Sequence, residues 1–140
     1  MTIYALSSGA GVSGVAIIRI SGSDTENVIK SLTGKEIPKP RMATLRKVNN
    51  INTCELIDEG IIIWFPGPDS YTGEDMAEIH VHGGKAVITS VQNEISKVKN
   101  CRLGEPGEFP KLAFQNEKIN LLKAESIADL ISGETEIQRL

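Results

Sequence analysis

The chain has 140 residues, of which 40% are hydrophobic and 24% are charged. These values are ordinary for a soluble globular domain, and they supply enough apolar material for a core without disulfides or a structural metal. The formal net charge of −3 argues against broad, charge-driven binding to nucleic acid.

Two features predict where the protein is found. Cys54 and Cys101 are far apart and form no CxxC pattern, which is typical of reduced thiols in the cytosol. The first residues carry no basic segment followed by a long apolar one, and no apolar run approaches the roughly 20 residues needed to cross a bilayer. We therefore expect a soluble, cytoplasmic protein that does not bind membranes.

The first half of the chain predicts three strands, at residues 3–6, 15–20 and 43–48. The second of them is β-branched and nearly continuously apolar, as a buried strand would be. After it, Ser23 or Asp24 is expected to cap a helix that runs to about residue 32, and Gly34 ends this helix. The inner face of the helix carries Val28, Ile29 and Leu32.

The second half predicts two more strands and three helices. The strongest strand signal covers residues 56–65, and a strand at 76–81 follows. Helices are expected at residues 85–98, 109–115 and 121–138, with an irregular segment at 101–108. The last helix meets no stop signal before the final residue, which suggests either that the chain was cut or that a partner of this helix is missing. Because strands and helices mix without strict βαβ alternation, we predict an α+β domain in which helices pack on a mixed β-sheet.

Three glycine motifs resemble nucleotide-binding loops without meeting their structural requirements. The run from Gly9 to Gly14 (G-A-G-V-S-G) has the spacing of a dinucleotide-binding loop, but a strand pattern follows it, whereas that loop must open a helix. A loop that joins two strands is the simpler interpretation. Gly34-Lys35 and Gly84-Lys85 lack the earlier glycine and the following Ser or Thr of a P-loop, so the sequence contains no recognisable nucleoside-triphosphate site.

Alternation along the 76–81 strand places Glu78 and His80 on one face, with His82 continuing the row. These side chains could form a two-His-one-carboxylate metal site, or they could line a polar pocket. The pocket is favoured because a glycine pair follows the strand and allows a ligand to come close. Glu78 offers a planar pair of acceptors that suits the N–H and NH₂ edge of a pyrimidine or pterin ring.

Two cations are ambiguous from the sequence alone. Arg19 interrupts an apolar strand, where it either forms a structural salt bridge or acts as a fork that holds a carboxylate or the edge of a heterocycle. Lys118 lies between two predicted helices and has the surroundings of a solvated surface residue. The residues by themselves predict an α+β domain with a candidate pocket for an anionic heterocycle.

Several stretches together resemble one family, in order and with its spacing, across nearly the whole chain. They are residues 14–22 (GVAIIRISG), 65–75 (FPGPDSYTGED), 78–84 (EIHVHGG), 105–109 (EPGEF) and 113–131 (AFQNEKINLLKAESIADLI). The second and the last stretch are individually specific. On these residues the chain resembles the N-terminal domain of the tRNA modification GTPases known as MnmE or TrmE.

That resemblance implies a fold similar to the folate-binding domain of aminomethyltransferases, a constitutive homodimer, and a bound 5-formyl- or 5,10-methylene-tetrahydrofolate. The folate would supply the methylene group added at carbon 5 of the tRNA wobble uridine during formation of carboxymethylaminomethyl-uridine. That reaction also needs an FAD-containing partner of the MnmG type and GTP hydrolysis. GTP, Mg²⁺ and K⁺ would bind only in a GTPase domain that this sequence lacks, so the chain alone is expected to be inactive.

The family's folate contacts fall on three matching positions, which are Arg19 in I-R-I-S-G, Glu78 after T-G-E-D, and Lys118 in F-x-N-x-K. Glu78 would accept from the pterin N3–H and 2-amino groups, and the two cations would serve polar or anionic parts of the folate. On this basis residues 1–118 form the folate-binding and dimerisation domain. Residues 119–140 are then the first helix of a truncated helical domain.

Two departures from the family pattern keep a second function open. The first glycine loop reads S-G-A-G-V-S-G where the family usually has P-G-R-G-G, so a basic residue is absent. The C-x-G-K tail that family members contribute to the folate site is also absent from this sequence. The alternative is therefore a dimerisation or interaction module that does not bind folate.

Overall fold

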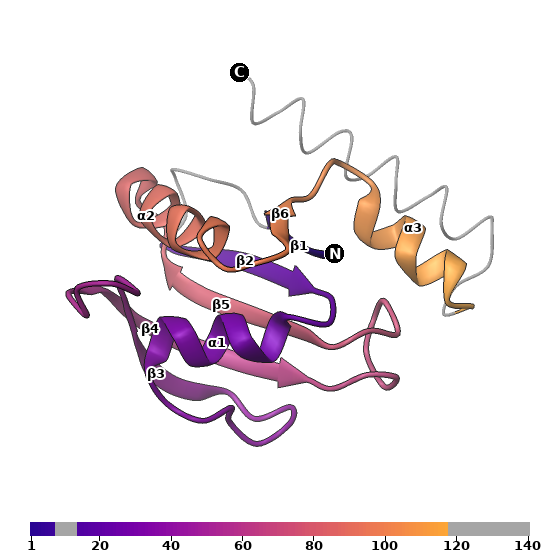
Figure 1. The fold of residues 1–140 in the computed structure, drawn as a ribbon, viewed down its shortest axis with the longest axis horizontal. Helices are drawn as coiled ribbons and strands as arrows, with labels where there is room; N and C mark the ends of the chain where they lie inside the picture. The colour runs from indigo at the N-terminus through magenta and orange to yellow at the C-terminus, as the bar shows by residue number, and fades with distance from the viewer. Residues whose placement is uncertain (8–13, 118–140) are drawn as a thin grey trace.

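The computed structural model describes residues 1–7 and 14–117. Within them, six strands form one sheet in the order β3-β4-β5-β2-β1-β6, accompanied by three helices (Figure 1). The strands are β1 (Thr2–Leu6), β2 (Val15–Ser21), β3 (Thr44–Asn49), β4 (Leu56–Phe65), β5 (Met76–His82) and β6 (Cys101–Leu103). The helices are α1 (Thr25–Thr33), α2 (Lys85–Ser96) and α3 (Glu108–Gln115).

Neighbouring strands of this sheet are antiparallel except β6, which runs parallel to β1. The predicted α+β fold with a mixed sheet is therefore confirmed. The prediction that residues 101–108 are irregular was wrong for their first three residues. A three-residue strand is too short to show alternation, and β6 forms because Cys101 and Leu103 pair with Thr2 and Tyr4 at the other end of the sequence.

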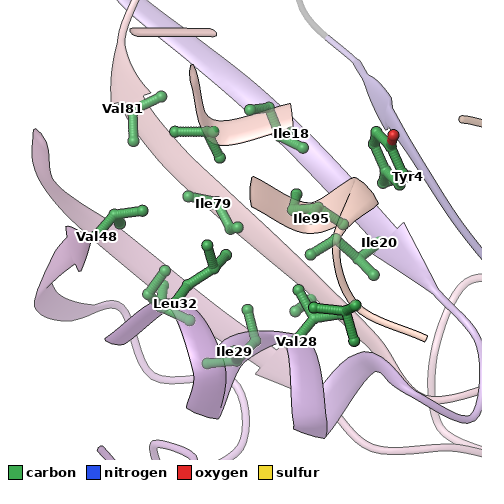
Figure 2. Close-up of a cluster of buried hydrophobic side chains, with 14 of the residues drawn as sticks. Tyr4, Ile18, Ile20, Val28, Ile29, Leu32, Val48, Ile79, Val81 and Ile95 are labelled. Carbon is green, nitrogen blue, oxygen red and sulfur yellow. The ribbon is translucent and has the colours of Figure 1, made fainter. Parts of the chain in front are cut away.

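One face of the sheet is covered by α1 and α2 and holds the main core (Figures 1 and 2). Ile62, Ile79 and Ile18 are directly paired across β4, β5 and β2, and all three are fully buried. The helices add Val28, Ile29 and Leu32 from α1, and Val91 and Ile95 from α2. The inner face predicted for α1 is thus confirmed, and the burial of these aliphatic side chains is the main source of stability.

The described residues cover the opposite face of the sheet only in part. At one end Phe109 of α3 packs with Ile3 and Met76. Away from that end the same face is less protected, and Val15 is 52% exposed. The strand predicted at residues 15–20 is thus fully buried on the covered face and only partly buried on this one, because no described helix covers this part of the second face. We call this surface the open face, and its central residues are Ile17, Arg19, Ile61, Ile63, Glu78 and His80.

The ends of the helices follow local signals with two exceptions. α1 starts directly after Asp24 and is ended by Gly34, whose φ of 67° is left-handed. The Asp24 side chain does not cap this helix, however, and the Asp24 N–H donates to Thr2 Oγ1 at 2.8 Å. α2 ends two residues before the predicted position 98 and carries a buried acid, Glu94, on its inner face.

Glu94 of α2 binds the turn between β3 and β4 through a hydrogen bond. Its carboxylate accepts hydrogen bonds from the Ile51 N–H at 2.8 Å and from Lys97 Nζ at 2.8 Å. Burial opposes ionisation of Glu94, but the hydrogen bonds from Lys97 and Ile51 outweigh it and lower the pKa of the carboxyl. A buried charge with two good donors is stable, which explains an acid on the apolar side of a helix.

Two predictions concern the end of the chain. The helix expected at 121–138, and with it the boundary expected between residues 118 and 119, lies outside the described residues. None of the helices in the described ranges is long and apolar enough to span a membrane.

Candidate functional site

The connection between β4 and β5 is held in place at the edge of the open face by polar side chains. The Ser21 hydroxyl at the end of β2 shares a hydrogen bond with the buried Thr72 hydroxyl at 2.8 Å and donates to Glu74 Oε1 at 3.0 Å. Asp75 Oδ1 accepts from the Gly67 N–H at 2.9 Å, which closes the loop on itself. These hydrogen bonds fix the conformation of the loop and, with it, the position of residue 71 near its centre.

A third anchor joins this loop to α3. The Asn116 side-chain amide, just past the end of the helix, donates to the Thr72 carbonyl at 2.7 Å. Thr72 is therefore bound by β2 on one side and by the end of α3 on the other. This connects two stretches that are distant in the sequence and were both part of the family resemblance.

Arg19 lies on β2 between Ala5 of β1 and Glu78 of β5. Its guanidinium carbon is 5.4 Å from the centre of the Tyr71 ring and 5.7 Å from the centre of the Phe109 ring. Both distances are within the range of cation–π attraction. No carboxylate among the described residues forms an ion pair with Arg19, so the structural salt bridge left open by the sequence is not found there.

The two rings that contact Arg19 were not identified as site residues from the sequence. Burial raises the pKa of the Tyr71 hydroxyl, and the positive charge of Arg19 offsets this only in part, so the ring is neutral at physiological pH. The buried hydroxyl oxygen has no hydrogen-bond partner in the part of the chain that is described. Tyr71 therefore interacts with Arg19 through its ring. The signal for both aromatics was their position inside two of the family stretches, 65–75 and 105–109.

Glu78 is the direct cross-strand neighbour of Arg19, yet it points elsewhere. Its Oε1 lies 2.9 Å from Nε2 of His80, and the two side chains are 24% and 25% exposed. Within the described residues the other carboxylate oxygen, Oε2, accepts no hydrogen bond. The structure thus brings an arginine and a glutamate side by side on the open face without pairing them.

His82 does not join Glu78 and His80. Its Nδ1 bonds Asp58 at 2.9 Å and its backbone N–H donates to the same carboxylate at 2.8 Å, while the ring is 76% exposed. Burial opposes ionisation of Asp58, but these bonds outweigh it and lower the pKa of its carboxyl. In the described ranges no three His, Cys, Asp or Glu side chains are grouped to hold a metal ion.

The remaining sequence motifs are the first glycine loop, Lys118 and the first Gly-Lys pair. Residues 8–13 of the first glycine loop and Lys118 lie outside the described residues. The elements on either side of that loop, β1 and β2, are antiparallel strands, which rules out the strand-to-helix geometry of a dinucleotide-binding loop. Gly34 is a helix C-cap, so the first Gly-Lys pair follows a helix instead of opening one.

Comparison with known proteins agrees with the motifs. A family model described as the GTP-binding protein TrmE N-terminus matches residues 2–118. The chain is 73% identical over 139 residues to the tRNA modification GTPase MnmE of Pelagibacter ubique, covering 99% of this chain and 31% of that protein. It is 50% identical over 139 residues to the MnmE of Maricaulis maris, again covering 99% of the chain and 31% of the relative.

A eukaryotic protein is similar to the chain over the same share of its length. The chain is 46% identical over 138 residues to the mitochondrial 5-taurinomethyluridine-[tRNA] synthase subunit GTPB3 of Danio rerio, covering 99% of the chain and 27% of the relative. The chain therefore spans about a third or less of the length of these relatives. The matched model and the identities, together with the motifs on the open face and its flanking loop, show that the chain belongs to the MnmE (TrmE) N-terminal domain family.

Proposed function

We propose that this chain is the tetrahydrofolate-binding and homodimerisation module of a GTPase that modifies carbon 5 of the tRNA wobble uridine. Family membership supports the proposal that the chain is part of such a GTPase, because the relatives are named as tRNA modification GTPases. GTP hydrolysis and cooperation with an FAD-containing partner would belong to parts of such a protein that this chain does not contain. The role of this chain would be to bind and present the folate.

The observation that carries the proposal is that, among the described residues, Arg19 and Glu78 lie side by side on the open face without pairing with each other. Two opposite charges on directly paired residues have side chains close enough to interact, and an ion pair would normally form. Here the guanidinium lies within cation–π distance of Tyr71 and Phe109, and among the described residues one carboxylate oxygen of Glu78 accepts no hydrogen bond. Such an arrangement suits a ligand that brings its own donors and acceptors between the two groups.

A reduced folate has the matching chemistry. Its pterin ring presents an N3–H and a 2-amino group side by side, and a carboxylate accepts from both because each of its oxygens has two lone-pair positions. Its carbonyl and its glutamate carboxylates are acceptors for cations, so Arg19 and Lys118 would serve these polar or anionic parts. In this proposal the folate-binding residues are Arg19, Glu78 and Lys118.

Calorimetric titration with 5-formyl-tetrahydrofolate tests the proposal. We expect saturable binding near one ligand per chain, and Glu78→Gln should weaken it at least tenfold, since a hydrogen bond to a charged group contributes about 1.5–3 kcal/mol. Glu59→Gln is the matched control, because Glu59 is an exposed acid on the neighbouring strand β4 and pairs in register with Lys47. Equal losses in both variants would contradict a specific role for Glu78.

Sedimentation equilibrium on the same samples separates the two functions. The alternative, a dimerisation module that does not bind folate, predicts a dimer that releases no heat with the ligand. A monomer that still binds 5-formyl-tetrahydrofolate would instead remove dimerisation from the proposal. The altered first glycine loop is the specific feature that favours the alternative.

A further inference from the structure

We infer that His80 is a positioning residue, which holds the Glu78 carboxylate away from Arg19 so that it remains available to the N–H edge of a ligand. This inference rests on the proposed function for its ligand, a reduced folate. It assigns a role to a histidine that the sequence linked only to a metal site or to a polar pocket.

The neighbours of Glu78 show why a positioning residue is needed. Across the strands it faces Arg19 on β2 and Ile63 on β4. With no other influence, an ionised Glu78 would turn to the arginine, because the two residues are direct cross-strand partners on a partly shielded surface. That ion pair would use the acceptor and the donors that the ligand requires.

The neighbours of His80 direct its ring to Glu78. Its cross-strand partners are Ile17 on β2 and Ile61 on β4, and neither side chain has a polar atom. On its own strand, His82 is bonded to Asp58. Nε2 of His80 therefore donates to Glu78 Oε1 at 2.9 Å, which fixes the carboxylate through one oxygen and leaves Oε2 open.

On the other side, the aromatic rings hold the arginine. Arg19 lies within cation–π distance of Tyr71 and Phe109, and these contacts draw the guanidinium toward the loop and α3. The separation of the two charges thus has two causes, one for each partner. Removal of the His80 donor frees Glu78 to close the gap, even though the rings are unchanged.

A pair of variants isolates the donor. His80→Phe keeps a planar ring and removes the hydrogen bond, whereas His80→Gln places a side-chain N–H donor at a similar distance from the backbone. We expect His80→Phe to weaken binding of 5-formyl-tetrahydrofolate about tenfold, and His80→Gln to restore most of the affinity. In a Glu78→Gln background His80→Phe should add almost no further loss, because the histidine acts through the glutamate.

Loss of packing would give a different pattern. It would lower the affinity in both backgrounds by the same factor, and Gln would not rescue it. Additive losses, or wild-type affinity in His80→Phe, would overturn the inference.

A ligand-free measurement keeps this result separate from the proposed function. Nitrogen-15 NMR of the His80 ring should show a proton on Nε2 that is hydrogen-bonded, and Glu78→Gln should change the Nε2 shift. If the wild-type chain shows this signature and binds no folate, the proposed function fails and the positioning contact stands. If the His80 ring does not respond to Glu78→Gln, the inference itself is overturned.

Discussion

The two faces of the sheet are built from the same strands and differ in almost every other respect. On the covered face, the neighbouring strands β4, β5 and β2 align Ile62, Ile79 and Ile18 under two helices, and all three side chains are fully buried. On the open face, the alternate positions of β2 and β5 carry Arg19 and Glu78, and among the described residues Arg19 contacts two aromatic rings and pairs with no carboxylate. Because alternate residues of a strand point to opposite faces, the packing that fixes one face also fixes the spacing of charges on the other.

The largest effect should separate two adjacent residues of β4. Ile62 is fully buried on the covered face, and Ile63 is partly exposed on the open face. We expect Ile62→Ala to lower the free energy of unfolding by about 3–4 kcal/mol, since it leaves a cavity, and Ile63→Ala by about 1 kcal/mol. Urea denaturation of both variants measures the difference. Similar losses would mean that the open face is packed as tightly as the core.

Arg19→Lys tests whether the open face serves binding more than stability. Lysine keeps the charge but loses the planar guanidinium that lies against Tyr71 and Phe109. We expect about a tenfold loss of affinity for 5-formyl-tetrahydrofolate by calorimetry, with a stability loss of about 1 kcal/mol or less. A lysine variant that unfolds several kcal/mol more easily would assign Arg19 to the fold instead.

Glu94 brings a charge to the covered face, and its effect should depend on pH. Glu94→Gln should cost about 1 kcal/mol at pH 7, because the bond to Lys97 loses its ionic partner. The folded-state pKa of Glu94 is lowered from 4.5, so its stabilising contribution is present above that pH and is lost as the pH falls through the folded-state value. Urea midpoints of the two proteins should therefore converge at acid pH. A gap that stays constant down to pH 3 would contradict a charge-based contribution.

The smallest effect is expected at the second histidine. His82, near the end of β5, has a 76% exposed side chain and is paired with Asp58. His82→Ala should change the stability by less than about 0.5 kcal/mol and leave folate affinity at the wild-type level, in contrast with His80→Phe. Differential scanning calorimetry and the same titration check both statements. A rise in Tm on addition of zinc that His82→Ala abolished would revive the metal interpretation of this strand.

The elements that were predicted best are those whose ends are marked by proline or glycine. The bounds of β4 match the prediction because Pro66 has no backbone N–H to continue the ladder, and Gly34 marks the end of α1 by adopting a left-handed conformation. β6 was not predicted because it forms only by pairing with β1, which is distant in the sequence. The burial of Glu94 was not predicted either, because one of the hydrogen-bond donors that stabilise its buried carboxylate comes from the β3–β4 turn.

The candidate site was predicted in part. Strand alternation placed Glu78 and His80 on one face, and the register confirms it. The side-chain partners of Arg19 could not be predicted, because Tyr71 and Phe109 reach it from a loop and a helix whose positions depend on Thr72, Ser21 and Asn116. Residue types at a given spacing predict which groups share a surface. They do not predict which of them will pair when aromatic rings and a histidine compete for the same charges.

The place of β1 in the sheet has a consequence for the order of assembly. Among the described strands β1 comes first along the chain, and it lies between β2, which follows it closely, and β6, which is synthesised only after four other described strands and two described helices. One edge of β1 is thus left without its native partner until β6 has been made. Contacts between such distant segments carry a high loop-closure cost and are typical of slowly folding domains. The sheet becomes complete on this side only when residues 101–103 have emerged and paired with β1.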